Sequence, residues 1–159
     1  MVAGITGHQR LGSNAATVWV RRQVRTILEN HRVTQGVGSL AIGADQLFAA
    51  VLLKMKIPYV AIVPCSLYAE TFSKTDLPKY LYFLRRACNI RELPFEKPSE
   101  EAFYEAGKIV VRESDLLIAV WDGEPARGLG GTADMVEYAK GLRKLLVQVN
   151  PVKRSMGLL

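Results

Sequence analysis

The chain has 159 residues, of which 49% are hydrophobic and 23% are charged, and its formal net charge is +6 at pH 7. This length and balance are typical of one globular domain and exclude a disordered, fibrous or disulfide-rich chain. The positive charge favours an anionic ligand. The basic residues are spread along the sequence instead of forming one run beside aromatic residues, so we interpret them as a solvated basic face.

The sequence lacks the usual signals for export, membrane insertion and metal binding. No cationic segment precedes the first apolar run, and no apolar stretch reaches the roughly 20 residues that span a bilayer. The two cysteines, Cys65 and Cys88, are too few for a disulfide framework and have no ligand spacing with His8 or His31. We therefore expect a cytoplasmic protein with reduced thiols and no membrane contact, metal site or resident cofactor.

Short apolar runs predict strands along the chain, and amphipathic segments between them predict helices. In the first half we expect a strand at 2–6, a helix from Asn14, a strand at 37–43, a helix at 44–56, a strand at 57–64, a loop at 65–74 and a helix at about 75–88. In the second half we expect a short extended piece and a loop with two prolines at 89–100, a helix after Ser99, a strand at 115–122, a helix from Thr132 and a strand at 144–150.

Strands that alternate with helices predict an α/β fold. We expect a single-domain, Rossmann-like, doubly wound and mainly parallel sheet with helices on both faces. This domain covers residues 1–150, and 151–159 form a C-terminal tail that is disordered or contacts a partner. Asn14 is the expected cap of the first helix, and Ser99, followed by Glu100 and Glu101, is the expected cap of the fourth.

Three loops that open helices have an unusual composition: TGHQRLGSN at 6–14, IGAD at 42–45 and WDGEPARGLGGT at 121–132. In a parallel sheet all strand-to-helix loops emerge at the carboxyl edge, where ligands bind near the switch in strand order. Each helix start also presents free N–H groups and a positive dipole end. The three loops therefore predict an anion site, although glycines that merely serve tight turns are the alternative interpretation.

The residue types in these loops suit a phosphorylated ligand. Glycine allows close backbone approach, Thr132 can cap its helix or donate its hydroxyl to phosphate, and the arginines can bind phosphate with two hydrogen bonds. The predicted ligand-binding residues are Thr6, Gly7, His8, Arg10, Gly43, Asp45, Asp122, Gly123, Arg127, Gly128, Gly130, Gly131 and Thr132.

Three side chains in these loops have two interpretations each. Asp122 can accept hydrogen bonds from ribose hydroxyls or a base, or it can stabilise its own loop. Asp45 can contact the ligand or serve as a first-turn acid of its helix. Trp121 can stack on a base, but strand alternation favours a position in the core.

The segments GITGHQRLG, IGADQLFAA, YVAIVPC, ESDLLIAVWDG and GLGGTADMVEYA together resemble the SLOG superfamily. This Rossmann-like group contains the DNA-processing protein A (Smf) domain, the Lonely Guy phosphoribohydrolases and the molybdenum cofactor carrier proteins. The sequence looks most similar to bacterial members without an assigned function, related to YpsA-type proteins, that share a TGHR start and a WDG…GGTA end. The resemblance covers residues 2–149 and implies a nucleotide or nucleotide-derived ligand over the glycine loop.

The sequence departs from the enzymes of this superfamily at the glycine motif. Lonely Guy enzymes and the similar nucleoside deoxyribosyltransferases carry a glutamate three residues after the threonine, where this chain has Met135. Leu129 also interrupts the glycines. Glu137 lies opposite the expected buried face of Met135, Val136, Ala139 and Leu142, and Asp134 is interpreted as a first-turn acid. Asp122 and Asp45 remain as weak catalytic candidates.

We therefore interpret the protein as a binder of a nucleotide or nucleotide-derived small molecule that acts as a sensor or carrier. One alternative is an enzyme, a phosphoribohydrolase or N-glycosidase that acts on nucleoside monophosphates. The other is binding of single-stranded nucleic acid, which the net charge and the IGAD loop favour. Relatives in the superfamily commonly self-associate, so we also expect a homo-oligomer.

Overall fold

Residues 1–125 and 130–159 are described by the computed structural model of the protein. Its first half contains β1 (Val2–Gly7), α1 (Asn14–Asn30), β2 (Gln35–Gly38), α2 (Ala44–Lys54), β3 (Tyr59–Val63), the 3-10 helix η1 (Tyr68–Thr71), α3 (Leu77–Leu84) and β4 (Asn89–Glu92). Its second half contains α4 (Glu100–Glu113), β5 (Leu116–Val120), α5 (Thr132–Gly141), β6 (Leu145–Asn150) and β7 (Ser155–Leu158). Every predicted strand and helix is present, with bounds that differ by a few residues.

The strands form one sheet in the order β4-β3-β2-β1-β5-β6-β7. All neighbouring pairs are parallel except β6 and β7, which are antiparallel. β1 and β5 lie side by side at its centre, with Ile5 opposite Ile118. This confirms the predicted doubly wound, mainly parallel sheet.

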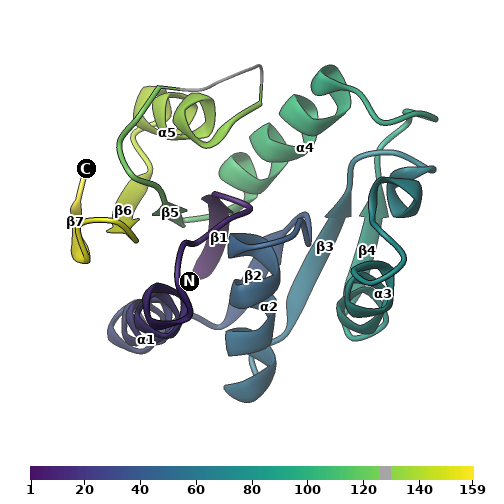
Figure 1. Ribbon diagram of the computed structural model, residues 1–159. Coiled ribbons are helices and arrows are strands. Elements are labelled where there is room, and N and C mark those ends of the chain that lie inside the picture. The colour runs from purple at the N-terminus through teal and green to yellow at the C-terminus, as the bar shows by residue number, and fades with distance from the viewer. Residues whose placement is uncertain (126–129) are drawn as a thin grey trace.

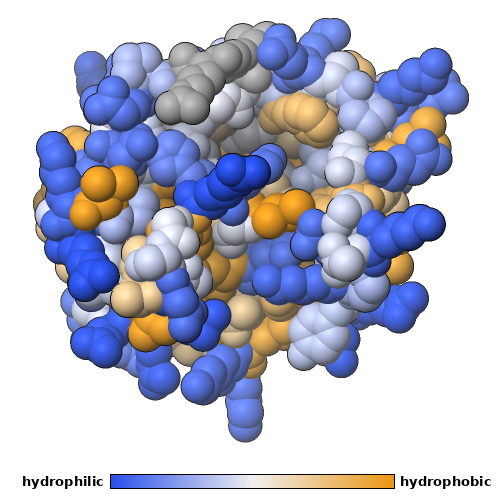
Figure 2. Space-filling view, viewed as in Figure 1, coloured by the Kyte–Doolittle hydropathy of each residue, from blue (hydrophilic) through white to orange (hydrophobic). Residues whose placement is uncertain are grey.

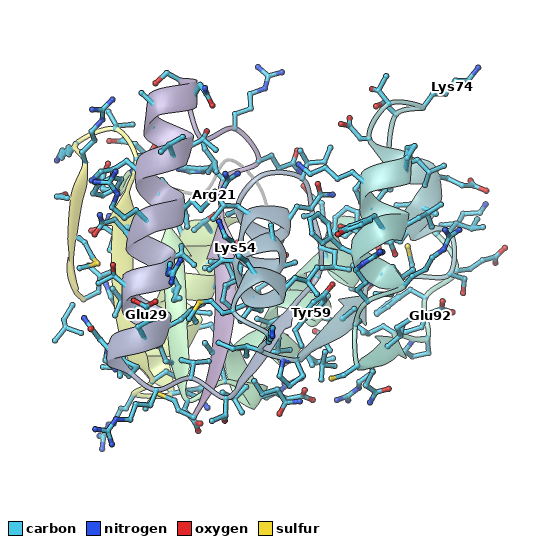
Figure 3. All side chains as sticks on the ribbon, turned by 90° about the horizontal axis from the view of Figure 1, so that it is seen from below. Arg21, Glu29, Lys54, Tyr59, Lys74 and Glu92 are labelled. Carbon is cyan, nitrogen blue, oxygen red and sulfur yellow. The ribbon has the colours of Figure 1, made fainter. Side chains whose placement is uncertain are left out.

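Helices cover both faces of the sheet (Figure 1). α1, α2 and α3 pack on one face, where Ile5 and Ile118 belong to the larger core cluster. Figure 3 shows these three helices side by side in front of the strands. α4 and α5 pack on the other face against Leu117 and Ala119. Because β5 is covered on both sides, all five of its residues are buried, as its apolar run predicts.

Two helix starts test the capping predictions. Ser99 caps α4, since its hydroxyl accepts a hydrogen bond from the Ala102 N–H at 3.1 Å, which confirms the prediction. The prediction of Asn14 as the first cap is wrong by one residue. Ser13 has the extended backbone of a cap and accepts from the Ala16 N–H at 3.2 Å, while Asn14 is already helical.

The second strand is shorter than predicted, because β2 ends at Gly38 and not at residue 43. Leu40 has φ 60° and Gly43 has φ 87°, and these left-handed values are incompatible with a strand. Residues 39–43 instead form the loop that leads into α2. Leu142 was expected on the buried face of α5, but it is 44% exposed because the helix ends at Gly141.

The C-terminal segment contains a strand that the sequence analysis did not predict. Ser155–Leu158 form β7 along the edge of β6, with Asn150 opposite Ser155. The Asn150 side-chain oxygen accepts from the N–H groups of Val152 and Lys153, which fixes the turn between the strands. Among residues 1–125 and 130–159, none of the helices combines the length and the hydropathy that a bilayer crossing requires.

Candidate functional site

The strand order changes direction at the centre of the sheet. From β1 the chain builds β2, β3 and β4 on one side, and it then returns through α4 to place β5 on the other side of β1. The loops that leave β1 and β5 therefore diverge at the carboxyl edge, and such a switch point is where open α/β sheets bind ligands.

A cleft of about 820 Å³ lies at this edge, which is within the size range of small-molecule sites. Figure 2 shows a hollow on one face of the molecule, with hydrophilic and hydrophobic side chains mixed around it. Nine of the predicted ligand-binding residues line the cleft: Thr6, Gly7, His8, Arg10, Asp45, Asp122, Gly130, Gly131 and Thr132. The three loops singled out in the sequence thus meet at one site.

The other four predicted ligand-binding residues are not among those that line the cleft in the described part of the chain. Arg127 and Gly128 lie outside the described residues. Gly43 and Gly123 are not among the residues that line the cleft. Gly123 is exposed, with φ 97°, in the turn that follows Asp122.

The glycines Gly7 and Gly43 are required by a crossing of the chain. The loop after β1 passes over the start of α2, where the Ala44 N–H donates to the His8 carbonyl at 3.1 Å. A Cβ on Gly43 would lie 2.3 Å from the Gln9 carbonyl oxygen, and one on Gly7 would lie 2.6 Å from the Ala44 Cβ. Both glycines are thus required by packing, without any role for a ligand. At the start of α2 the Ala44 N–H is already bound to the His8 carbonyl oxygen.

His8 and Asp122 join the first and last loops across the cleft. The Nε2 atom of His8 lies 3.1 Å from Oδ1 of Asp122 and 3.3 Å from the Asp122 backbone nitrogen. A protonated Nε2 donates to the carboxylate, whereas an unprotonated Nε2 accepts from the backbone N–H. The pKa of Asp122 is lowered, first by the hydrogen bond from the Glu124 N–H and then by His8. Asp122 is therefore an ionised, half-exposed carboxylate.

Asp45 is a second carboxyl group in the cleft, with a different environment. It is only 9% exposed, and burial raises its pKa to about 6, although hydrogen bonds from the loop N–H groups, with Ser39 first, act in the opposite direction. Its Oδ2 accepts from the Ser39 N–H at 3.0 Å. Asp45 is thus both the first-turn acid of α2 and a residue of the cleft wall, so the two interpretations from the sequence are compatible.

The start of α5 lines the cleft with backbone groups. Gly131 is the N-cap residue and supplies no side-chain cap, and the N–H groups of Thr132 and Ala133 have no partner among the described residues. Asp134 is a first-turn acid as predicted, and its carboxylate accepts from the Gly130 N–H at 2.8 Å. Free N–H groups and a positive helix end are the features that bind phosphate.

Part of the cleft wall is aromatic, and the sequence analysis missed it. Tyr68 and Phe72, from the segment after β3, lie with their rings 5.2 Å apart, and Phe103 of α4 is 6.1 Å from Tyr68. Phe103 is 37% exposed. The 65–74 segment was expected as a loop, and its position after a parallel strand already indicated the carboxyl edge, but no pattern in it marked these rings.

Trp121 combines parts of both sequence interpretations. Its ring packs against the core below α4 and α5, and it also lines the cleft. The indole N–H donates to the Glu124 carbonyl at 2.8 Å, which fixes the ring beside Asp122.

No model of a known protein family matches the sequence, and no curated protein matches it. Solved structures match its fold. DNA processing protein A from Streptococcus pneumoniae has a TM-score of 0.68 and 17% identity over 93% of this chain and 50% of its own. The single-stranded-DNA-binding DNA processing protein A from Helicobacter pylori has a TM-score of 0.69 and 19% identity over 94% of this chain and 65% of its own.

The molybdenum cofactor carrier protein from Chlamydomonas reinhardtii is also similar, with a TM-score of 0.59 and 13% identity over 92% of this chain and 74% of its own. The chain spans between half and two thirds of the length of the two DNA processing proteins. Its similarity to all three extends over nine tenths of its own length. The protein therefore has the Rossmann-like fold of these structures.

Proposed function

We propose that the protein binds a nucleotide or nucleotide-derived small molecule in the cleft and acts as a sensor or carrier. One observation carries this proposal: a single cleft is lined both by the start of α5, whose cap residue Gly131 supplies no side-chain cap, and by aromatic side chains, among them the exposed Phe103. A nucleotide has the matching distribution of charge and ring surface. The SLOG-like fold of nucleic-acid-binding and cofactor-binding proteins supports the same ligand class.

The dimensions of the sheet support this ligand. The phosphate end lies beyond β5, and the Asp45 wall lies beyond β2, with β1 between them. Adjacent strands are roughly 4.8 Å apart, so the ends of β5 and β2 are separated by roughly 10 Å. This distance suits one extended nucleotide, whose ribose then lies near the ionised Asp122 carboxylate, an acceptor for its hydroxyl groups.

The charge of the cleft favours a small ligand over a nucleic-acid strand. Among the described residues that line it, Arg10 is the one permanent cation, while Asp45, Asp122 and Glu124 are acidic. A strand-binding groove requires several cations to neutralise successive phosphates, which makes binding strongly salt dependent. We therefore expect weak salt dependence, and a steep loss of affinity with salt would favour the nucleic-acid alternative.

A second candidate function is hydrolysis of an N-glycosidic bond, and the two carboxyl groups favour it. The pKa of Asp122 is lowered, whereas that of Asp45 is raised to about 6. Environments that separate two carboxyl pKa values are typical of acid–base pairs in active sites. In this scheme ionised Asp122 stabilises the developing positive charge on the ribose, and protonated Asp45 gives its proton to the base as the bond between the base and the anomeric carbon breaks. Water then attacks the anomeric carbon, and the proton that it loses returns to the Asp45 carboxylate.

The test begins with mass spectrometry of small molecules released from the purified protein, followed by calorimetric titration of the ligand-free protein with nucleoside monophosphates. We expect binding that Gly131→Asp abolishes, because this change puts bulk and negative charge at the start of α5. Gly157→Asp is the control, since Gly157 lies in β7 with open space around its Cα. Unchanged affinity in Gly131→Asp would refute the phosphate position.

Chromatography of the same mixtures separates the two candidate functions. Intact nucleotide after prolonged incubation supports a sensor or carrier. Release of free base that disappears in Asp122→Asn supports the hydrolase.

A further inference from the structure

Asp45, Tyr68 and Phe72 line the cleft from the segments that follow β2 and β3. Asp45 follows β2 at the start of α2, while Tyr68 and Phe72 follow β3. The negative charge of Asp45 is close enough to Tyr68 to raise the pKa of its hydroxyl further, after burial, which is the main cause. Asp45, Phe72 and Phe103 line the same cleft, so a planar ring placed against the two phenylalanines shares this cavity with the carboxyl group.

One oxygen of Asp45 is available to such a ring. Oδ2 accepts from the Ser39 N–H, and the N–H groups of Leu40 and Ala41 are close enough to lower the pKa of the carboxyl group, but among the described residues no hydrogen bond of ordinary geometry reaches Oδ1. Within that part of the chain no fully buried side-chain oxygen or nitrogen lacks a partner, so Oδ1 must reach solvent. Asp45 is a cleft-lining residue, so this solvent is in the cleft. Oδ2 retains a second lone pair for a further donor.

A carboxylate accepts hydrogen bonds and cannot donate them, so it selects a base edge with two adjacent donors. Guanine presents N1–H and the 2-amino group side by side. Adenine presents an acceptor at N1 beside its amino group, and this acceptor faces the carboxylate unfavourably. Xanthine keeps N1–H but replaces the 2-amino group with a carbonyl oxygen, which repels the carboxylate.

We propose that Asp45 reads the base of the bound nucleotide and selects a ring with a guanine-type donor edge, which stacks against Phe103 and Phe72. This inference rests on the proposed nucleotide-binding function. At about pH 8 the carboxyl group is ionised, because its pKa is about 6, so it acts as a double acceptor. Pterins carry the same donor edge, and neopterin distinguishes them from guanine nucleotides.

The test compares the affinities of GMP, AMP, XMP and neopterin for the full chain and for Asp45→Asn by calorimetry at about pH 8. In the unmodified protein GMP should bind at least about tenfold more tightly than AMP or XMP, as expected for one well-formed pair of base contacts. In Asp45→Asn the new amide donates to the xanthine 2-oxygen and opposes the guanine 2-amino group. The preference should therefore reverse in favour of XMP by a similar factor.

Two further variants separate edge recognition from stacking and from general effects of a lost charge. Asp76→Asn removes a carboxylate outside the cleft and should leave the order of affinities unchanged. Phe103→Ala should weaken binding of all the bases by about fivefold or more, without changing their order, since stacking tolerates any base.

Each outcome has a distinct meaning. A GMP preference that Asp45→Asn reverses supports the inference, and tighter binding of neopterin than of GMP assigns the same edge to a pterin. Nucleotide binding without a base preference, or with one that Asp45→Asn leaves unchanged, overturns the role of Asp45 while the proposed function stands. No binding of any nucleotide overturns the proposed function itself.

Discussion

Replacing Asp45 with asparagine should make the stability of the protein respond to pH in a characteristic way. The unfolded chain releases the Asp45 proton near the ordinary value of 3.8, whereas the folded protein retains it up to about pH 6. Between these values the folded state binds more protons, so the free energy of unfolding falls as pH rises. This difference in pKa corresponds to a loss of about 3 kcal/mol in the free energy of unfolding. The loss is absent below the unfolded pKa and is complete above about pH 6.

Asp45→Asn removes this titration and keeps an oxygen for the Ser39 N–H. Relative to the unmodified protein, the variant should therefore gain stability with increasing pH. Urea unfolding measures the difference at each pH, and about 2 kcal/mol of the change should appear between about pH 4.5 and 7.5. A difference that stays constant, or that decreases as pH rises, would refute a buried carboxyl group at this position.

Three further predictions concern the scaffold, and urea unfolding at neutral pH measures each of them. Gly43→Ala should lower the free energy of unfolding by about 2 kcal/mol or more, because Gly43 has a positive φ and carbonyl oxygens lie beside its Cα. Gly141→Ala is the control: Gly141 lies in open space at the end of α5, so this change should leave the free energy of unfolding unchanged or raise it by up to about 1 kcal/mol. Equal effects of the two substitutions would contradict the chain crossing. Ser99→Ala should cost about 1 kcal/mol through loss of the α4 cap, and no cost would mean that the cap is replaced by solvent. Tyr59→Phe should cost about 1 kcal/mol, since the Tyr59 hydroxyl donates to the buried Phe83 carbonyl at 2.6 Å, and a stabilised variant would show that this bond is not formed in solution.

The local patterns of the sequence were sufficient for the central elements of the fold. The run at 115–122 is apolar almost throughout, so it had to be a strand covered on both faces, and β5 is such a strand. Ser99 with its two following glutamates marked the start of α4 because the cap depends on neighbours three residues away. The errors occurred where distant contacts decide. β2 was predicted too long because nothing local indicated that residues 39–43 would turn to carry Asp45 toward the cleft.

The C-terminal strand and the aromatic end of the cleft illustrate the same limit. Ser155–Leu158 form a strand only because β6 offers an open edge, and the segment itself has no buried face. Phe72 and Phe103 come from elements that are separated by the third helix and the edge strand. Neither ring has a pattern that indicates a shared wall, since their proximity depends on how η1 and α4 pack over the ends of the strands.

The sequence by itself determined the fold class of the protein and the edge of the sheet at which the candidate cleft lies. Alternating strands and helices leave few topologies for a parallel sheet, and all its strand-to-helix loops must open at one edge. Only the tertiary structure decided the character of the individual side chains. It buried Asp45 and left Asp122 half-exposed beside His8, so two aspartates that look alike in the sequence have pKa values shifted in opposite directions. The reason is that a pKa depends on desolvation and on hydrogen bonds from residues far away along the chain.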